Sequence, residues 1–81
     1  MRWGFAIACA AILSACQADA ETYTLYRSSL VDSLGRVHIA TFDTTEGEAY
    51  NLENCNLVAA LLQAQDGVQT RFWCEKGSYR P

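Results

Sequence analysis

The sequence is poor in the residues on which most enzyme sites and nucleic-acid interfaces depend. Among 81 residues it has one histidine, one proline and six basic side chains, and its formal net charge is −3. Nucleic-acid binding needs a basic face, so this charge balance argues against a nucleic-acid partner. A chain of this length builds one small core, which excludes a multidomain enzyme and a nucleotide-binding Rossmann unit.

Motifs that carry catalytic or metal chemistry are also missing. Zinc needs four ligands, which His38 and two oxidised cysteines do not supply, and no spacing supports a hydrolytic triad of His38 with Asp43 and Ser28 or Ser29. The acidic segment 43–48 does not fit a calcium-binding EF-hand loop, which needs carboxylates at positions 1, 3 and 5 and glycine at position 6. Counted from Asp43, positions 3, 5 and 6 are a threonine, a glycine and a glutamate. We therefore expect no catalytic residue, no metal and no cofactor, and a protein that is not an enzyme.

Long apolar runs are absent too, yet apolar residues are concentrated at the N-terminus. Residues 1–20 hold 15 apolar positions, and the run over residues 3–15 is 13 residues long. A membrane-spanning helix needs about 20 apolar residues. A short positive start, a brief apolar stretch and a small-residue segment are typical of a secretory signal. The sequence thus predicts a signal over residues 1–20 and a single small domain over residues 21–81.

Two cleavage sites fit this signal. Residues 13–16 (Leu-Ser-Ala-Cys) resemble the lipobox of bacterial lipoproteins. That resemblance implies cleavage before Cys16, acyl chains on this cysteine and, with Gln17 after it, sorting to the outer membrane. Residues 18–20 (Ala-Asp-Ala) instead fit the ordinary signal peptidase, which would release a soluble protein starting at Glu21. We expect either an outer-membrane lipoprotein facing the periplasm or a soluble periplasmic protein, with membrane contact only through a lipid anchor on Cys16.

A helix is predicted after residue 50. Asn51 is the expected N-cap, Tyr50 and Cys55 stand at the two positions of a hydrophobic staple, and Gly67 is the expected stop. The apolar residues that recur at the spacing of one helical face are Leu52, Cys55, Val58, Ala59 and Leu62.

Three strands complete the predicted domain. Residues 22–27 and 37–42 are rich in β-forming residues, and residues 68–74 alternate between apolar and polar positions. The order β-β-α-β predicts an α+β fold with one helix packed on a three-stranded sheet. A right-handed crossover could join the second and third strands in parallel, while the strand order stays open. Residues 77–81 are expected to be a disordered tail.

Cys55 and Cys74 are the two cysteines that follow the signal. An oxidising destination makes a disulfide their default state. From Cys55 to Asp66 a helix rises about 16 Å, and a returning strand over residues 68–74 runs about 20 Å. The strand would therefore bring Cys74 level with Cys55, and we predict a disulfide between them.

The sheet should have one face without a helix, because one helix covers only one side of three strands. Aromatic side chains must then lie partly on the open face: Tyr23 or Tyr26, His38 or Phe42, and Trp73. The candidate contact residues are Tyr26, His38 and Trp73. Such a patch would suit a partner protein, a second copy or the membrane boundary. The alternative is that these long side chains only shield an undersized domain.

A resemblance to a protein group is carried by four runs: residues 23–27 (Tyr-Thr-Leu-Tyr-Arg), residues 36–43 (Arg-Val-His-Ile-Ala-Thr-Phe-Asp), the pair Asn54 and Cys55, and residues 72–77 (Phe-Trp-Cys-Glu-Lys-Gly). In these runs the chain resembles a group of small, uncharacterised exported bacterial proteins. The resemblance covers most of residues 22–77. It implies export and one compact domain, and it implies no activity, substrate or catalytic residue.

Two functional hypotheses follow. The first is a non-catalytic envelope protein, a binding or structural module, which contacts a protein or another envelope component through the open sheet face. The alternative is a small secreted inhibitor that engages a hydrolase through a rigid loop, either residues 28–36 or residues 43–48.

Overall fold

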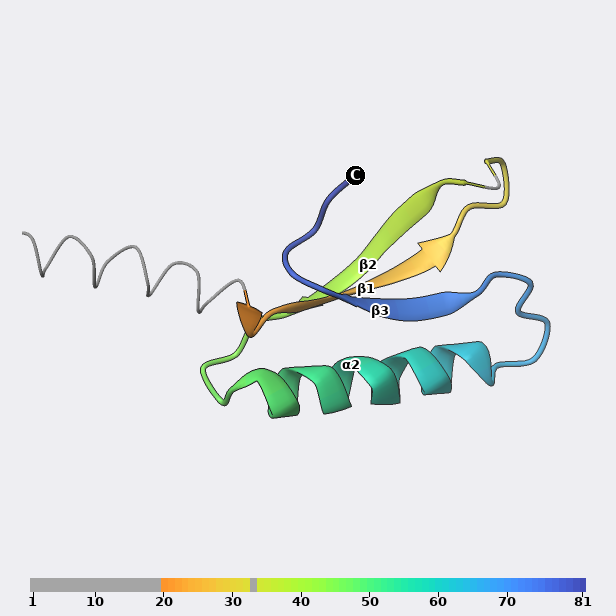
Figure 1. Cartoon of the computed structure of the whole chain (residues 1–81). Helices are drawn as coiled ribbons and strands as arrows, with labels where there is room; N and C mark the ends of the chain where they lie inside the picture. Colours follow the sequence, from red (N-terminus) through yellow and green to blue (C-terminus); the bar gives the residue numbers. More distant parts are fainter. Residues whose placement is uncertain (1–19, 33) are drawn as a thin grey trace, which may run out of the picture.

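The computed structural model describes residues 20–32 and 34–81. Its elements are, in chain order, β1 (Tyr23–Ser28), β2 (Arg36–Phe42), α2 (Glu48–Gln63) and β3 (Phe72–Lys76), shown in Figure 1. This confirms the predicted α+β class and the β-β-α-β order. Of the predicted signal, only Ala20 is described, and the proposed lipidation site Cys16 lies outside the described residues. No helix in the described part of the chain is long and apolar enough to cross a membrane.

The sheet has the strand order β2-β1-β3, and β1 pairs antiparallel with both neighbours. The second and third strands therefore run parallel to each other, as a crossover requires, but β1 lies between them. Leu25 and Tyr26 are adjacent in β1 and both are fully buried. Successive side chains of a strand point to opposite faces, so β1 is covered on both sides. In a sheet of three strands the central strand is the one best covered on both faces. The burial of Leu25 and Tyr26 therefore accounts for the central position of β1.

The core lies between α2 and the sheet. Its buried residues are Tyr23, Leu25, Cys55 and Ala59, and the half-buried residues packed against them are Ala40, Phe42, Leu52, Val58, Leu62, Phe72 and Cys74. The predicted disulfide is confirmed: Cys55 and Cys74 are bonded, with their Cα atoms 6.2 Å apart. The strand that carries Cys74 begins at Phe72, four residues later than predicted, so this cysteine lies in mid-strand.

The start of the helix differs from the prediction. Helix α2 begins at Glu48 with Gly47 before it, and Asn51 lies inside the helix, only 1% exposed. Tyr50 is 48% exposed, so the predicted staple with Cys55 is also wrong. The reason is tertiary: the Asn51 side chain bonds to main-chain atoms of the preceding loop and of the chain entering β1, and not to the first turn of its own helix.

The tail (residues 77–81) is ordered, contrary to the prediction. It turns back across the sheet on the side opposite α2, as Figure 1 shows for the stretch that ends at the C-terminal label. Gly77 has a φ of 106°, a backbone conformation open to glycine, and it makes the reversal directly after β3. The sheet face without a helix is therefore covered in part by the chain itself.

Candidate functional site

The three predicted contact residues meet on the sheet face that the tail crosses. Tyr26 in β1 is paired with His38 in β2 and with Trp73 in β3. Directly paired residues of neighbouring strands point to the same side, so the three side chains share one face. The rings of Tyr26 and Trp73 are stacked with their centroids 6.0 Å apart. We call this surface, together with Thr24 of β1 and Arg36 of β2, the tail-side face.

The three predicted contact residues differ in how far they are exposed to solvent. His38 is exposed and Trp73 is half-buried, but Tyr26 is fully buried. Tyr26 is therefore not a free contact residue while the tail is in place, which corrects the expectation of an open aromatic patch. The physical reason is that the tail supplies the cover that a single helix could not.

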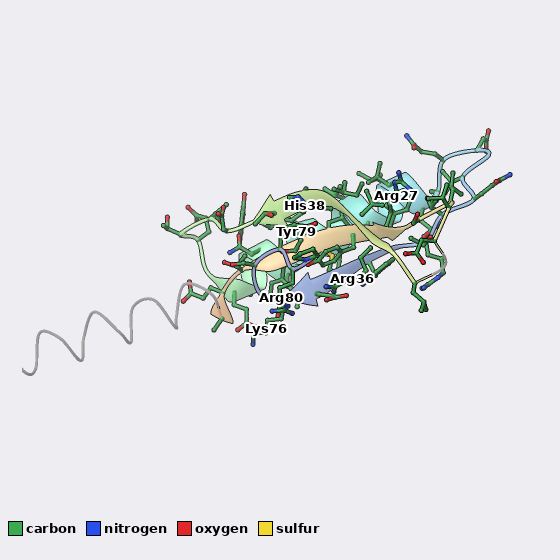
Figure 2. All side chains as sticks on the ribbon, turned by 90° about the horizontal axis from the view of Figure 1, so that it is seen from above. Arg27, Arg36, His38, Lys76, Tyr79 and Arg80 are labelled. Atoms are coloured by element: carbon green, nitrogen blue, oxygen red, sulfur yellow. A yellow bond between two sulfur atoms is a disulfide. The ribbon has the colours of Figure 1, made fainter. Side chains whose placement is uncertain are left out.

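Polar contacts between sheet side chains and the tail's main chain hold the tail in place. Thr24 Oγ1 donates a hydrogen bond to the Gly77 carbonyl at 2.7 Å. The Tyr26 hydroxyl accepts the Arg80 N–H at 3.0 Å. Arg36 Nη2 donates to the Arg80 carbonyl at 2.6 Å and reaches the Pro81 carbonyl at 3.4 Å. Figure 2 shows Arg36, Tyr79 and Arg80 together over the strands.

Ring contacts add to these bonds. The Tyr79 ring lies 4.6 Å from the His38 ring and 6.1 Å from the Tyr26 ring, centroid to centroid. The Arg36 guanidinium lies 4.6 Å from the centre of the Tyr26 ring, within the range of a cation–π interaction. Sequence reasoning missed Arg36, Tyr79 and Arg80 as parts of this face. The sequence did offer one signal that the tail packs on the domain, a tyrosine shortly after Gly77. An aromatic side chain in a short tail is stabilised when it is buried against the domain.

Glu75 fixes Arg36 from the β3 side. Arg36 Nη1 is 2.5 Å from Glu75 Oε1, and the Trp73 indole N–H donates to the other carboxylate oxygen at 2.8 Å. These two contacts, the indole bond first and Arg36 second, hold the pKa of Glu75 below its ordinary value. The carboxylate therefore stays ionised at neutral pH, and Arg36 keeps its orientation.

A second group of charged and polar side chains lies on the helix side of the sheet. There Lys76 (2.9 Å) and the Tyr23 hydroxyl (2.8 Å) both contact the Glu48 carboxylate and lower its pKa.

The loop between β1 and β2 is a second candidate surface. Leu30, Val31 and Leu34 are 71%, 97% and 89% exposed, and we call these three residues the hairpin tip. They belong to the predicted loop over residues 28–36, of which position 33 lies outside the described residues.

The backbone of this loop is braced by its own polar groups. Ser29 Oγ accepts the N–H groups of Val31 and Asp32, both at 3.2 Å. Asp32 Oδ1 accepts the Leu34 N–H at 3.1 Å, and the Asp32 carbonyl accepts the Gly35 N–H at 2.8 Å. These hydrogen bonds brace the described residues on either side of position 33, and the three apolar side chains remain exposed.

The other predicted loop, residues 43–48, is built differently. Its polar atoms turn inward, where Thr44 bonds to the side chain of Asn51 through its N–H at 3.1 Å and its hydroxyl at 2.7 Å. The outward side chains are acidic or hydroxyl-bearing. Within residues 20–32 and 34–81, no three or more His, Cys, Asp or Glu side chains form a group that could hold a metal ion.

Comparison with protein-family models, with curated proteins and with solved structures finds no match to this chain. The tail-side face and the hairpin tip are therefore the two candidate functional surfaces among the described residues.

Proposed function

We propose that the protein is a small exported binding module without catalytic activity, and that it contacts a protein partner through the hairpin tip. The observation that carries this proposal is the exposure of Leu30, Val31 and Leu34 on one braced loop. Single exposed apolar residues are ordinary, but three large ones on a short loop mark an interaction site. Loop residues that are held by their own hydrogen bonds lose less conformational entropy on binding, which favours affinity.

We assign to the hairpin tip the partner-binding role that the sequence led us to expect of the open sheet face. On that face Tyr26 is already buried beneath the tail, whereas the tip has no such cover from the described residues. The partner's matching surface would be an apolar hollow that accepts two or three aliphatic side chains.

Export is supported by the signal-like composition of residues 1–20, and the Cys55–Cys74 disulfide is compatible with an oxidising compartment. Mass spectrometry of the mature chain tests export and the anchor together. We expect either an acylated N-terminal Cys16 or a free N-terminus at Glu21. A mature chain that retains Met1 would contradict export.

A lipid anchor would also orient the tip. The chain enters β1 at Tyr23, and the hairpin tip follows the end of this strand at Ser28, as Figure 1 shows. Six residues of strand span about 20 Å. A domain held at Cys16 by a few residues would thus point its tip away from the anchoring bilayer, which favours a protein over that lipid surface as the occupant.

The tip can be tested by changing its three side chains to serine in one variant, Leu30→Ser/Val31→Ser/Leu34→Ser. With a photo-crosslinking group in place of Ser33, so that the bracing side chains of Ser29 and Asp32 are kept, the protein with an unchanged tip should form a discrete crosslinked product in envelope extracts, and the serine variant should form about tenfold less. The matched control is Leu57→Ser/Leu61→Ser, because these α2 leucines are 57% and 62% exposed. Equal crosslinking by the two serine variants would overturn the assignment of the site.

Hydrolase inhibition is a second candidate, favoured by the braced conformation of the same loop. An inhibitor loop gains affinity from being held ready for the enzyme's cleft. In a panel of purified secreted hydrolases, competitive inhibition by the wild type that disappears in the triple serine variant would identify this activity.

A further inference from the structure

The tail-side face contacts the main chain of the segment that crosses it. Three of its side chains, Thr24, Tyr26 and Arg36, bond to carbonyl or amide groups of the tail. Main-chain groups are common to every peptide, so these contacts do not require the tail's own sequence. Another extended segment laid along the same path would meet the same donors and acceptor.

Selectivity on this face comes from one aromatic position. The Tyr79 ring lies beside His38 at 4.6 Å and near Tyr26 at 6.1 Å, while 43% of Tyr79 stays exposed. The next residue, Arg80, presents its carbonyl to Arg36. The tail thus presents to this face an aromatic side chain, directly followed by a residue whose carbonyl meets the Arg36 guanidinium.

Contacts that do not involve the tail also orient the side chains of this face. Arg36 is fixed by Glu75 and by the Tyr26 ring, and Tyr26 is itself stacked with Trp73. All these contacts are between strands. A site whose groups already point the right way binds with a smaller entropic loss than one that must rearrange.

The tail is also separable from the core. The core lies on the other side of the sheet, around the Cys55–Cys74 disulfide, and the tail joins β3 at Gly77, where φ is 106°. Residues 78–81 are each exposed overall. Rotation near Gly77 would lift the tail and uncover Tyr26 and Trp73 while the helix and the core stay in place.

We propose that the tail-side face is a binding site for an extended peptide segment of another protein, carrying an aromatic residue followed by a carbonyl for Arg36. The chain's own tail occupies this site in cis and competes with that segment. This site is separate from the hairpin tip, so its failure would leave the proposed function untouched. A tethered competitor acts at an effective concentration of order millimolar, which weakens the apparent affinity for the free peptide.

The test uses the full chain and the acetylated peptide Gly-Ser-Tyr-Arg-Pro, with the NMR signal of the Trp73 indole N–H as the readout. Tyr79→Ser removes the tail's ring contacts and leaves the face intact. We expect the peptide to shift the Trp73 signal saturably and to bind Tyr79→Ser about tenfold more tightly than the wild type, because aromatic contacts of the tail no longer compete.

Two controls make the result specific. Tyr50→Ser changes a tyrosine of similar exposure (48% against 43%) on α2, and it should bind the peptide as the wild type does. A peptide with serine at the tyrosine position should leave the Trp73 signal unshifted. The proposal is overturned if Tyr79→Ser shows no saturable shift, or if the serine peptide binds equally well.

Discussion

Replacing Cys55 and Cys74 together by alanine is expected to lower the free energy of unfolding by about 3 kcal/mol. The bond closes a loop with a sequence separation of 19, and the chain-entropy model assigns about that free energy to a loop of this length. For a domain of about 60 residues this corresponds to a fall in Tm on the order of 15 °C. Thermal unfolding followed by circular dichroism measures it directly.

The position of the disulfide explains why the effect should be large. Cys55 is fully buried in α2, and Cys74 lies in the middle of the edge strand β3. A small core supplies little stability in excess of the conformational entropy lost on folding, so a covalent link between helix and sheet matters more here than in a larger domain. Reduction of the wild type should reproduce the loss. A change below about 1 kcal/mol in both experiments would show that packing alone holds α2 on the sheet.

Asn51→Asp is expected to cost about 3 kcal/mol at neutral pH. The Asn51 amide joins three segments: Oδ1 accepts the Thr44 N–H and hydroxyl, and Nδ2 donates to the Glu21 carbonyl at 2.8 Å and the Thr44 carbonyl at 3.1 Å. Aspartate has almost the same shape, but it cannot make the two donations. It would also place a negative charge, 1% exposed, against two carbonyl oxygens.

The pH dependence of this variant has a definite sign. Burial and the facing carbonyls would raise the pKa of the introduced carboxyl above its unfolded value. Stability should therefore be lost as the pH rises through that raised pKa, and it should recover as the pH falls and the carboxyl is protonated. Urea unfolding at several pH values measures both the loss and the recovery.

Asn56→Asp is the matched control, since it makes the same change at an exposed position of α2. Its effect should stay within about 0.5 kcal/mol and show no comparable pH dependence. Equal losses in the two variants would mean that added negative charge on the helix, and not the Asn51 bonds, is responsible.

Asn51 also bears on the proposed export. Through the Glu21 carbonyl it fastens the chain just before β1, and Thr22 is already buried. A mature chain starting at Glu21 would enter the fold at its first residue. A lipid-anchored chain starting at Cys16 would have only residues 17–20 between its acylated cysteine and this fixed point, so the domain would lie close to the membrane.

Local sequence patterns predicted correctly which segments form the helix and the strands, but they placed the ends of these segments poorly. The apolar spacing from Leu52 to Leu62 identified α2, and the alternation around Phe72 identified β3, because burial on one face leaves a period in the sequence. The N-cap was misplaced because asparagine is as suitable for a cap as for a buried amide that bonds to distant main chain. Only the neighbours of Asn51 distinguish the two roles.

The sequence by itself determined the class of fold and the pairing of Cys55 with Cys74, since composition and periodicity act through local propensity and burial. The tertiary structure alone decided that β1 is central, that the tail covers Tyr26 and that the apolar loop residues stand free in solvent. Each of these depends on contacts between segments far apart in the chain. Thr24, Tyr26 and Arg36 bind the tail through its main chain, and main-chain recognition leaves no pattern in the sequence of the segment that is bound.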